Sequence, residues 1–206
     1  MGDLIGLSDR LEERSALRTA GGRPAFYFDL ACPGSYLAAE RVERLLGEVD
    51  WIPACGPAFS ASSAHEAEER AAALRLPLVW PQRWPRGVPG AMRAAVYAAE
   101  GGAGARFALA AFRLAYCGAY DLEDPEVLSE LAAAVGVPRE GCLRAAAVEL
   151  WRDQALSSAA RPLERRGVRR LPAFGLAGRL FEGEPALSGA AALLRDTRRP
   201  ALAHPA

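Results

Sequence analysis

The side chains with the clearest chemical potential lie in one short run, Asp29-Leu30-Ala31-Cys32-Pro33-Gly34-Ser35-Tyr36. Cys32 follows an aromatic-rich segment of strand length and directly precedes a helical pattern that begins at Pro33. Because proline favours the first helical position, we expect Cys32 at the N-cap, where its sulfur meets free backbone N–H groups and the positive end of the helix dipole. Both effects favour the thiolate and lower the pKa of a cysteine below its usual value of about 8.5. The run predicts a nucleophilic thiol; the alternative is a cysteine that packs as a small apolar side chain.

The other cysteines, Cys55, Cys117 and Cys142, have no such context, and for them the packing role is favoured. Their spacing is wide and irregular, which indicates no disulfide framework. The two histidines, His65 and His204, lie far from each other and from any cysteine pair, so no zinc site is indicated. We therefore expect free thiols in a reducing cytoplasm and no metal.

The composition of the chain limits the classes of binding partner that we expect. The 206 residues are 51% hydrophobic, enough for a sizeable core, and their formal net charge is zero, with 25 basic and 25 acidic side chains. Without a basic field, nucleic acid is not an expected partner. No apolar run reaches the length of a membrane span, and residues 1–20 carry acidic side chains without a signal-peptide core. The sequence thus predicts a cytoplasmic location and no membrane partner.

The elements that position Cys32 form a strand–helix–strand unit. Ala25–Leu30 and Val49–Cys55 predict strands, and Pro33–Gly47 between them has helical periodicity. A unit of this length favours a parallel pair of strands. The helix therefore begins where the first strand ends, with Cys32 at the junction.

The rest of the chain divides into a helical part and a second group of strands. A short amphipathic helix is predicted over Leu4–Thr19. Helices are also predicted over His65–Leu74, Ala91–Glu100, Arg106–Tyr116, Pro125–Val135 and Arg139–Arg166, the last broken near Glu149. A hairpin of Ala173–Ala177 and Arg179–Glu182 follows, and Pro185–Arg195 predicts a closing helix. The long helical part looks like an insertion.

Several motifs carry a resemblance to a known family. Phe26–Asp29 with Cys32–Leu37 resembles the opening of the DsbA-like family, which contains 2-hydroxychromene-2-carboxylate isomerases and kappa-class glutathione transferases. The likeness extends over about residues 25 to 195, through Leu76-Pro77-Leu78, Trp80–Pro85, Ala91–Ala95 and Leu171–Phe174.

The resemblance implies an α/β, thioredoxin-like fold of the order β-α-β … β-β-α with an α-helical insertion domain. We place the thioredoxin-like domain at residues 23–56 and 168–197 and the insertion at residues 57–167. Residues 1–22 form an N-terminal extension and residues 198–206 a tail.

The resemblance also implies roles for individual residues. In the isomerases and transferases a serine beside glutathione occupies the position of Cys32, and in the disulfide oxidoreductases this position is the attacking cysteine of a Cys-x-x-Cys pair. Here Ser35 holds the second position of the pair, so the chain has half of each pattern. Cys32 and Ser35 are the predicted catalytic residues, with Ser35 orienting the sulfur. Pro172 is expected to be cis and to face Cys32, and Leu171 to offer main-chain hydrogen bonds to a peptide or glutathione.

The predicted binding set for glutathione or substrate is Pro33, Trp84, Arg170, Leu171, Pro172 and Glu184. Trp84 either floors an apolar substrate pocket or covers the core of the insertion. Arg170 either binds a carboxylate or phosphate or complements the end of a preceding helix. Glu184 either reaches the γ-glutamyl ammonium or acts only as an acid at a helix start, because Pro185 replaces the Asp that the isomerases and transferases carry.

The predicted function is that of a thiol-dependent oxidoreductase or a glutathione-dependent isomerase or transferase, acting on a disulfide or a small molecule with glutathione as cosubstrate. The chain has no Lys, although the isomerases place one between residues 56 and 72, which disfavours the isomerase's own substrate. The competing hypothesis is a catalytically silent thioredoxin-like module that binds a small molecule or a partner. A homodimer is implied by the resemblance alone, and no sequence feature fixes the oligomeric state.

Overall fold

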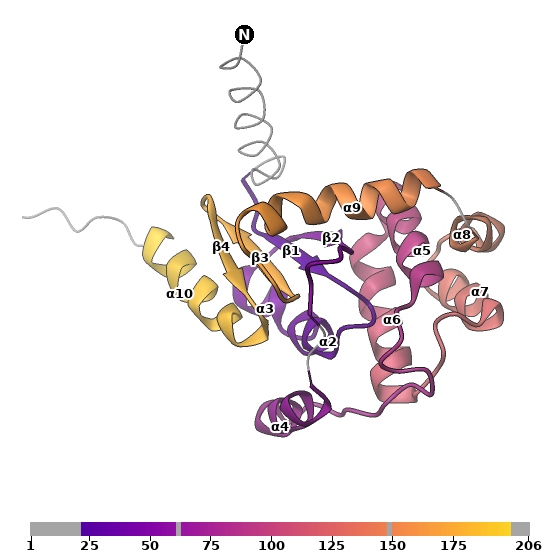
Figure 1. Ribbon diagram of the computed structural model, residues 1–206, viewed down its shortest axis with the longest axis horizontal. Coiled ribbons are helices and arrows are strands. Elements are labelled where there is room, and N and C mark those ends of the chain that lie inside the picture. The colour runs from indigo at the N-terminus through magenta and orange to yellow at the C-terminus, as the bar shows by residue number, and fades with distance from the viewer. Residues whose placement is uncertain (1–21, 61–62, 148–149, 199–206) are drawn as a thin grey trace, which may run out of the picture.

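A four-stranded mixed sheet organises the computed structural model, which describes residues 22–60, 63–147 and 150–198 (Figure 1). The strands are β1 (Ala25–Phe28), β2 (Asp50–Pro53), β3 (Ala173–Leu176) and β4 (Arg179–Glu182), in the spatial order β2-β1-β3-β4. β1 pairs with β2 in parallel, and the β1–β3 and β3–β4 pairs are antiparallel. The predicted β-α-β … β-β-α arrangement is confirmed.

The helix after β1 differs from the prediction of one helix over Pro33–Gly47. It is two short helices, α2 (Pro33–Ala39) and α3 (Val42–Leu46), separated at Glu40 and Arg41. The side chains at this break are held by different elements: Arg113 pairs with Glu40, and Glu184 pairs with Arg41. The break thus coincides with tertiary ion pairs, which the periodicity of the sequence cannot predict.

The helical insertion is present as predicted between β2 and β3. Its helices are α4 (Ala64–Leu74), α5 (Pro89–Glu100), α6 (Gly104–Gly118), α7 (Pro125–Ala134), α8 (Arg139–Ala146) and α9 (Leu150–Arg165). The end of α8 and the start of α9 flank the predicted break near Glu149, which itself lies outside the described residues. The closing helix begins as a 3-10 turn, η1 (Glu184–Ala186), and continues as α10 (Leu187–Arg198). The predicted helix over Leu4–Thr19 also falls outside the described residues.

The two faces of β1 bury different sets of side chains, as the two-residue period of a strand requires. Phe26 and Phe28 face the larger core, where Phe28 meets Phe112 of α6 with ring centroids 5.7 Å apart. Tyr27 faces a smaller cluster that includes Leu163 of α9. Figure 1 shows α5 to α8 grouped at the end of the molecule opposite α10. The insertion therefore packs directly against the strand that ends beside Cys32.

No helix in the described ranges is long and apolar enough to cross a membrane.

Candidate active site

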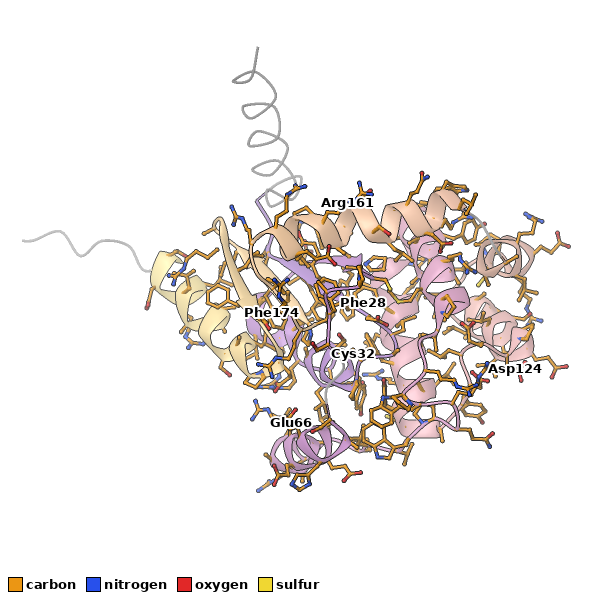
Figure 2. All side chains as sticks on the ribbon, in the orientation of Figure 1. Phe28, Cys32, Glu66, Asp124, Arg161 and Phe174 are labelled. Carbon is orange, nitrogen blue, oxygen red and sulfur yellow. The ribbon has the colours of Figure 1, made fainter. Side chains whose placement is uncertain are left out.

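Cys32 occupies the N-cap of α2, as the position of Pro33 predicts. Its N–H donates to the Asp29 carbonyl at 3.0 Å, which closes the turn after β1, and its carbonyl accepts from the N–H of Ser35 at 3.0 Å. Figure 2 shows Cys32 at the centre of the molecule, near the end of the strand that carries Phe28. The junction of β1 and α2 thus fixes the cysteine backbone on both sides.

The Cys32 sulfur faces the predicted cis-proline. Cys32 Sγ donates to the carbonyl of Leu171 at 3.1 Å, and the Leu171–Pro172 peptide bond is cis, as expected. Gly34 leaves room for this approach: a Cβ there would lie 3.3 Å from Pro172 Cδ and 3.6 Å from the Cys32 sulfur. The structure brings Cys32, Leu171 and Pro172 together.

The predicted lowering of the Cys32 pKa is wrong for this structure. Burial of the sulfur raises the pKa of Cys32, and the negative charge of Asp29 adds to the increase. Hydrogen bonds from the Ser35 hydroxyl and from the N–H groups of Gly34 and Ser35 act in the opposite direction and are outweighed. The helix start therefore supplies the stabilising groups that the sequence predicts, but the unliganded site holds a neutral thiol.

Ser35 lies where it can act on the sulfur. Its side chain is fully buried, and its Oγ accepts from the N–H of Asp29 at 3.4 Å. Because its hydroxyl favours the thiolate of Cys32, Ser35 is in place for the orienting role predicted for it.

A small cavity of about 150 Å³ opens onto Cys32. Pro33, Trp84 and Leu171 line it together with Asp29. Trp84 also packs on Trp80, with ring centroids 4.2 Å apart, and both rings lie against the main core. Trp84 therefore packs over the core of the insertion and also contributes to the wall of the small cavity.

A larger cavity of about 750 Å³ lies beyond Gly34 and Leu171. Three of the predicted binding residues, Arg170, Leu171 and Glu184, line it, and α4 closes another side with Arg70. Leu171 belongs to the walls of both cavities, so its backbone links the thiol to the larger space.

The Glu184 carboxylate is buried on the wall of the larger cavity. One oxygen pairs with Arg41 at the break between α2 and α3, and the other pairs with Nε of Arg70 on α4. Sequence reasoning missed both arginines, because no pattern links residues that stand 143 and 114 positions from Glu184.

The model of the DSBA-like thioredoxin domain matches residues 25–194. The chain belongs to the DSBA-like thioredoxin family. The family resemblance seen in the sequence is thereby confirmed.

Solved structures share the family fold at low identity. 2-Hydroxychromene-2-carboxylate isomerase is 15% identical with a TM-score of 0.70, covering 84% of this chain and 97% of that one. The cytosolic disulfide reductase DsbM from Pseudomonas aeruginosa, in a structure with GSH, is 18% identical with a TM-score of 0.65, covering 86% and 100%. A probable DsbA oxidoreductase from Streptomyces coelicolor is 19% identical with a TM-score of 0.64, covering 87% and 92%. No curated protein matches the chain. The likeness confirms the thioredoxin-like fold with a helical insertion.

In this DSBA-like chain Arg170 stands at the mouth of the larger cavity. Its side chain is 58% exposed, and its Nε lies 3.6 Å from the Glu182 carboxylate. It follows the end of α9 at Arg165 by five residues, which places it beyond the helix terminus that the alternative interpretation invoked. The guanidinium is accessible to a ligand carboxylate.

Asp29 is the residue of the site that sequence reasoning missed. Its half-buried side chain lines the small cavity with Cys32 and a further cavity of about 230 Å³ with Cys55. Asp29 Oδ1 accepts from the N–H of Ala31 at 2.8 Å, and burial raises the pKa of the carboxyl to about 6. An acidic residue directly after a buried strand and three positions before the cysteine was the available signal.

Among the described residues no group of three or more His, Cys, Asp or Glu side chains is arranged to hold a metal ion.

Proposed function

We propose that this protein is a monothiol disulfide oxidoreductase in which Cys32 attacks a substrate disulfide. The observation that carries the proposal is the placement of Cys32 Sγ 3.1 Å from the Leu171 carbonyl, beside cis-Pro172, with a serine at the position of the second cysteine. A thiol at this junction has the two neighbours that thiol–disulfide exchange needs: donors for the thiolate on α2, and an extended backbone that can align a peptide.

Exchange at Cys32 proceeds in two balanced steps. The Cys32 sulfur attacks one sulfur of RS–SR, forms the mixed disulfide Cys32–S–S–R and releases the other half as a thiol. Because Ser35 cannot supply a second thiol, an external thiol such as glutathione attacks the R sulfur, forms GS–SR and releases Cys32. Per cycle, one RS–SR and one glutathione are converted into one RSH and one mixed disulfide GS–SR.

The larger cavity is the proposed place for glutathione or an extended peptide. It adjoins Leu171 and presents Arg170, whose guanidinium is suited to a carboxylate. Both oxygens of Glu184 are occupied by guanidiniums, so we assign Glu184 to hold Arg70 at the cavity wall and not to pair with the γ-glutamyl ammonium. The structure of DsbM with GSH supports a glutathione site in a neighbour of this fold.

A glutathione-dependent isomerase or transferase is the second candidate. The isomerase neighbour favours it, as does the small cavity beside Cys32, where Trp84 supplies an apolar wall for a small molecule. In that reaction Cys32 would polarise the glutathione thiol and would form no mixed disulfide. Trapping of a Cys32 mixed disulfide therefore separates the two reactions.

A reducing compartment suits the proposed reaction, because it supplies the resolving thiol. All four cysteines are free, in keeping with the cytoplasmic location that the sequence predicts.

The test compares wild type with Cys32→Ser and Cys32→Ala in glutathione-dependent reduction of bis(2-hydroxyethyl) disulfide. Both variants are expected to lose the activity, and mass spectrometry of wild type is expected to show the mixed disulfide on Cys32. Cys117→Ser, which changes an exposed thiol on α6, is the matched control and should retain it. Activity that survives in Cys32→Ser would refute the proposal, and ligand binding without turnover in wild type would favour the silent binding module.

A further inference from the structure

We propose that Phe59 and Ser60 restrict Cys32 to mixed disulfides of glutathione with a compact thiol that carries no carboxylate, and exclude extended polypeptides from the site. This inference rests on the proposed function and narrows it, because that function allows either glutathione or an extended peptide in the larger cavity. Both residues lie in the segment of residues 56–60 after β2, outside the motifs around Cys32 and Pro172.

The first restriction is on backbone pairing beside the thiol. In a β ladder the groups that face one edge belong to alternate residues, so a peptide strand added at Leu171 would next pair with Arg169 or Ala173. The N–H of Ser60 already donates to the Arg169 carbonyl at 2.7 Å. Ala173 is paired on both sides inside the sheet, with β1 and with β4. A ladder that begins at Leu171 therefore ends there, which suits a tripeptide and gives a longer peptide no further pairing.

The segment of residues 56–60 is held against the site at both ends. Gly56 approaches α9 so closely that a Cβ there would meet the Glu164 side chain. The same carboxylate accepts from a backbone N–H of the segment at 3.3 Å, and Ser60 is held by the bond described above. Between these anchors, Phe59 packs against the same buried cluster as Cys32. The segment therefore forms a wall of the site that is attached to the rest of the fold.

The second restriction is the space in front of the thiol. Phe59 and Ser60 line the small cavity together with Cys32 and Trp84. The volume of this cavity is about 150 Å³. That equals roughly five water molecules of about 30 Å³ each, and it lies below the range of about 300–1,000 Å³ that is usual for sites of drug-sized ligands. One short substituent on sulfur fits there, whereas a cysteine with peptide on both sides does not.

Charge decides which half of the disulfide occupies which cavity. Among the described residues that line the small cavity, Asp29 is the one with a charged side chain. The larger cavity carries both signs, with Arg70 and Arg170 beside several glutamates, as glutathione does with its carboxylates and its ammonium group. The glutathione half therefore favours the larger cavity, and the small cavity takes a half without a carboxylate.

The reaction of this substrate, R′S–SG, follows the two steps of the proposed function. Cys32 attacks the glutathione sulfur, the bond between that sulfur and R′S breaks, and the proton lost by the Cys32 thiol ends on R′SH. A second glutathione then attacks the glutathione sulfur of Cys32–S–SG, forms GSSG and returns Cys32 as the thiol. The compact thiol is thus reduced, and two glutathione halves are oxidised to GSSG.

The test compares two substrates that share the attacked sulfur and differ in the leaving thiol. They are the glutathione mixed disulfides of 2-mercaptoethanol and of a cysteine at the centre of an extended, uncharged peptide. Each kcat/KM is divided by the rate constant of the uncatalysed reaction with glutathione, which corrects for the reactivity of the leaving thiol. Wild type should favour the 2-mercaptoethanol disulfide by about 100-fold, a factor that discrimination by pocket shape reaches. Equal corrected values would overturn the inference and leave the Cys32 reaction standing.

Phe59→Ala and Ser60→Pro separate the two restrictions. The first enlarges the small cavity, and the second removes the N–H that occupies the Arg169 carbonyl. Each should raise the corrected kcat/KM for the peptide disulfide by about tenfold, with no gain for the 2-mercaptoethanol disulfide. Phe181→Ala, which truncates another partly buried phenylalanine outside both cavities, is the matched control and should keep the wild-type ratio.

The outcomes distinguish this inference from the proposed function. A wild-type preference that neither Phe59→Ala nor Ser60→Pro reduces would overturn the role of these residues. Turnover of either disulfide by Cys32→Ser, or of neither by wild type, would overturn the proposed function as well.

Discussion

At the level of single residues, the Cys32 sulfur is subject to opposing influences that come from separate parts of the chain. The Ser35 hydroxyl and the N–H groups at the start of α2 favour the thiolate, while burial and the Asp29 charge favour the thiol. Leu171 stabilises the thiol further by accepting its hydrogen. Reactivity therefore depends on how substrate entry changes this balance, and each contribution can be removed separately.

Ser35→Ala is predicted to raise the pKa of Cys32 further. The variant removes a hydroxyl that favours the thiolate, and a hydrogen bond to a charged group contributes about 1.5–3 kcal/mol. The measurement is the rate of Cys32 alkylation against pH, resolved by peptide mass spectrometry, with the Cys55 peptide of the same digest as the control. Wild type should show a midpoint above about 8.5. A midpoint that Ser35→Ala leaves in place would show that the hydroxyl does not bond the thiolate.

Asp29→Asn is predicted to stabilise the folded protein at neutral pH. Burial raises the carboxyl pKa from 3.8 to about 6, so the native state binds its proton more strongly than the unfolded chain. The ionised carboxylate therefore costs stability above pH 6, by about 1–3 kcal/mol, and the cost vanishes below pH 4. Urea unfolding of both proteins at pH 4 and pH 7 checks the prediction: the variant should gain only at pH 7. Equal midpoints at pH 7 would contradict the raised pKa.

The sequence places the cysteine correctly and misjudges its protonation. Pro33 fixes the start of α2, and the N-cap position of Cys32 follows from that local signal. The sulfur is buried where segments distant in sequence meet: Cys32 packs against the cluster that contains Leu171, and Phe59 lines the same small cavity. Local positions can therefore be predicted, whereas the electrostatic environment of the sulfur depends on contacts that form only in the fold.

At the level of elements, one buried carboxylate connects three parts of the chain. Glu184 at the start of η1 pairs with Arg41 between α2 and α3 and with Arg70 on α4. Residues of α2, α4 and η1 also line the larger cavity, among them Glu66 of α4, the helix that lies below α2 in Figure 2. The ion cluster therefore sets the distance between α4 and the start of α10, and with it the width of the proposed glutathione site.

Glu184→Gln is predicted to destabilise the protein and to weaken glutathione binding. Loss of the charge leaves two guanidiniums without their partner, at a cost of about 3 kcal/mol, the lower end for a broken buried pair because the Arg70 side chain is 34% exposed. Urea unfolding measures the first effect and the glutathione KM of the reductase assay the second. Glu140→Gln, at an exposed Glu–Arg pair on α8 that does not line the larger cavity, should change stability by less than about 0.5 kcal/mol. Equal effects of the two variants would argue against the cluster.

The helices and strands lie close to the ranges that the sequence predicts, whereas the breaks between them are predicted less well. A residue type that favours the N-cap marks the start of α7, where the Asp124 side chain accepts from the N–H of Glu126. No local sequence signal marks the break between α2 and α3, because Arg113 and Glu184, which pair with the two residues at the break, come from distant elements. Sheet order is equally non-local: that β3 lies beside β1 was supplied by the family resemblance and not by any property of the strand.

At the level of the whole molecule, the sheet and the insertion share one core. Phe28 of β1 contacts Phe112 of α6, and Phe112 continues the aromatic contacts to Tyr116, which stacks on Tyr36 of α2. The helix that carries Cys32 is thus held on one side by the insertion. The helices between β2 and β3 interrupt the sheet in sequence, yet they share its core, and we expect the sheet and these helices to unfold as one cooperative unit.

Phe112→Ala is therefore predicted to lower the stability of the entire protein without separating the two parts. Phe112 is fully buried, and truncation of a buried phenylalanine costs about 3–5 kcal/mol. In a background in which Trp80, Trp84 and Trp151 are replaced by Phe, so that fluorescence reports Trp51 in β2, urea unfolding is followed by that fluorescence and by far-ultraviolet circular dichroism, which reports mainly the helices of the insertion. The two midpoints should coincide with and without Phe112→Ala. A matched substitution, Leu109→Ala on a partly exposed position of α6, should shift both midpoints by a smaller amount. If the Trp51 transition stays in place while the helical signal moves to lower urea, the insertion unfolds by itself, and α2 does not depend on it.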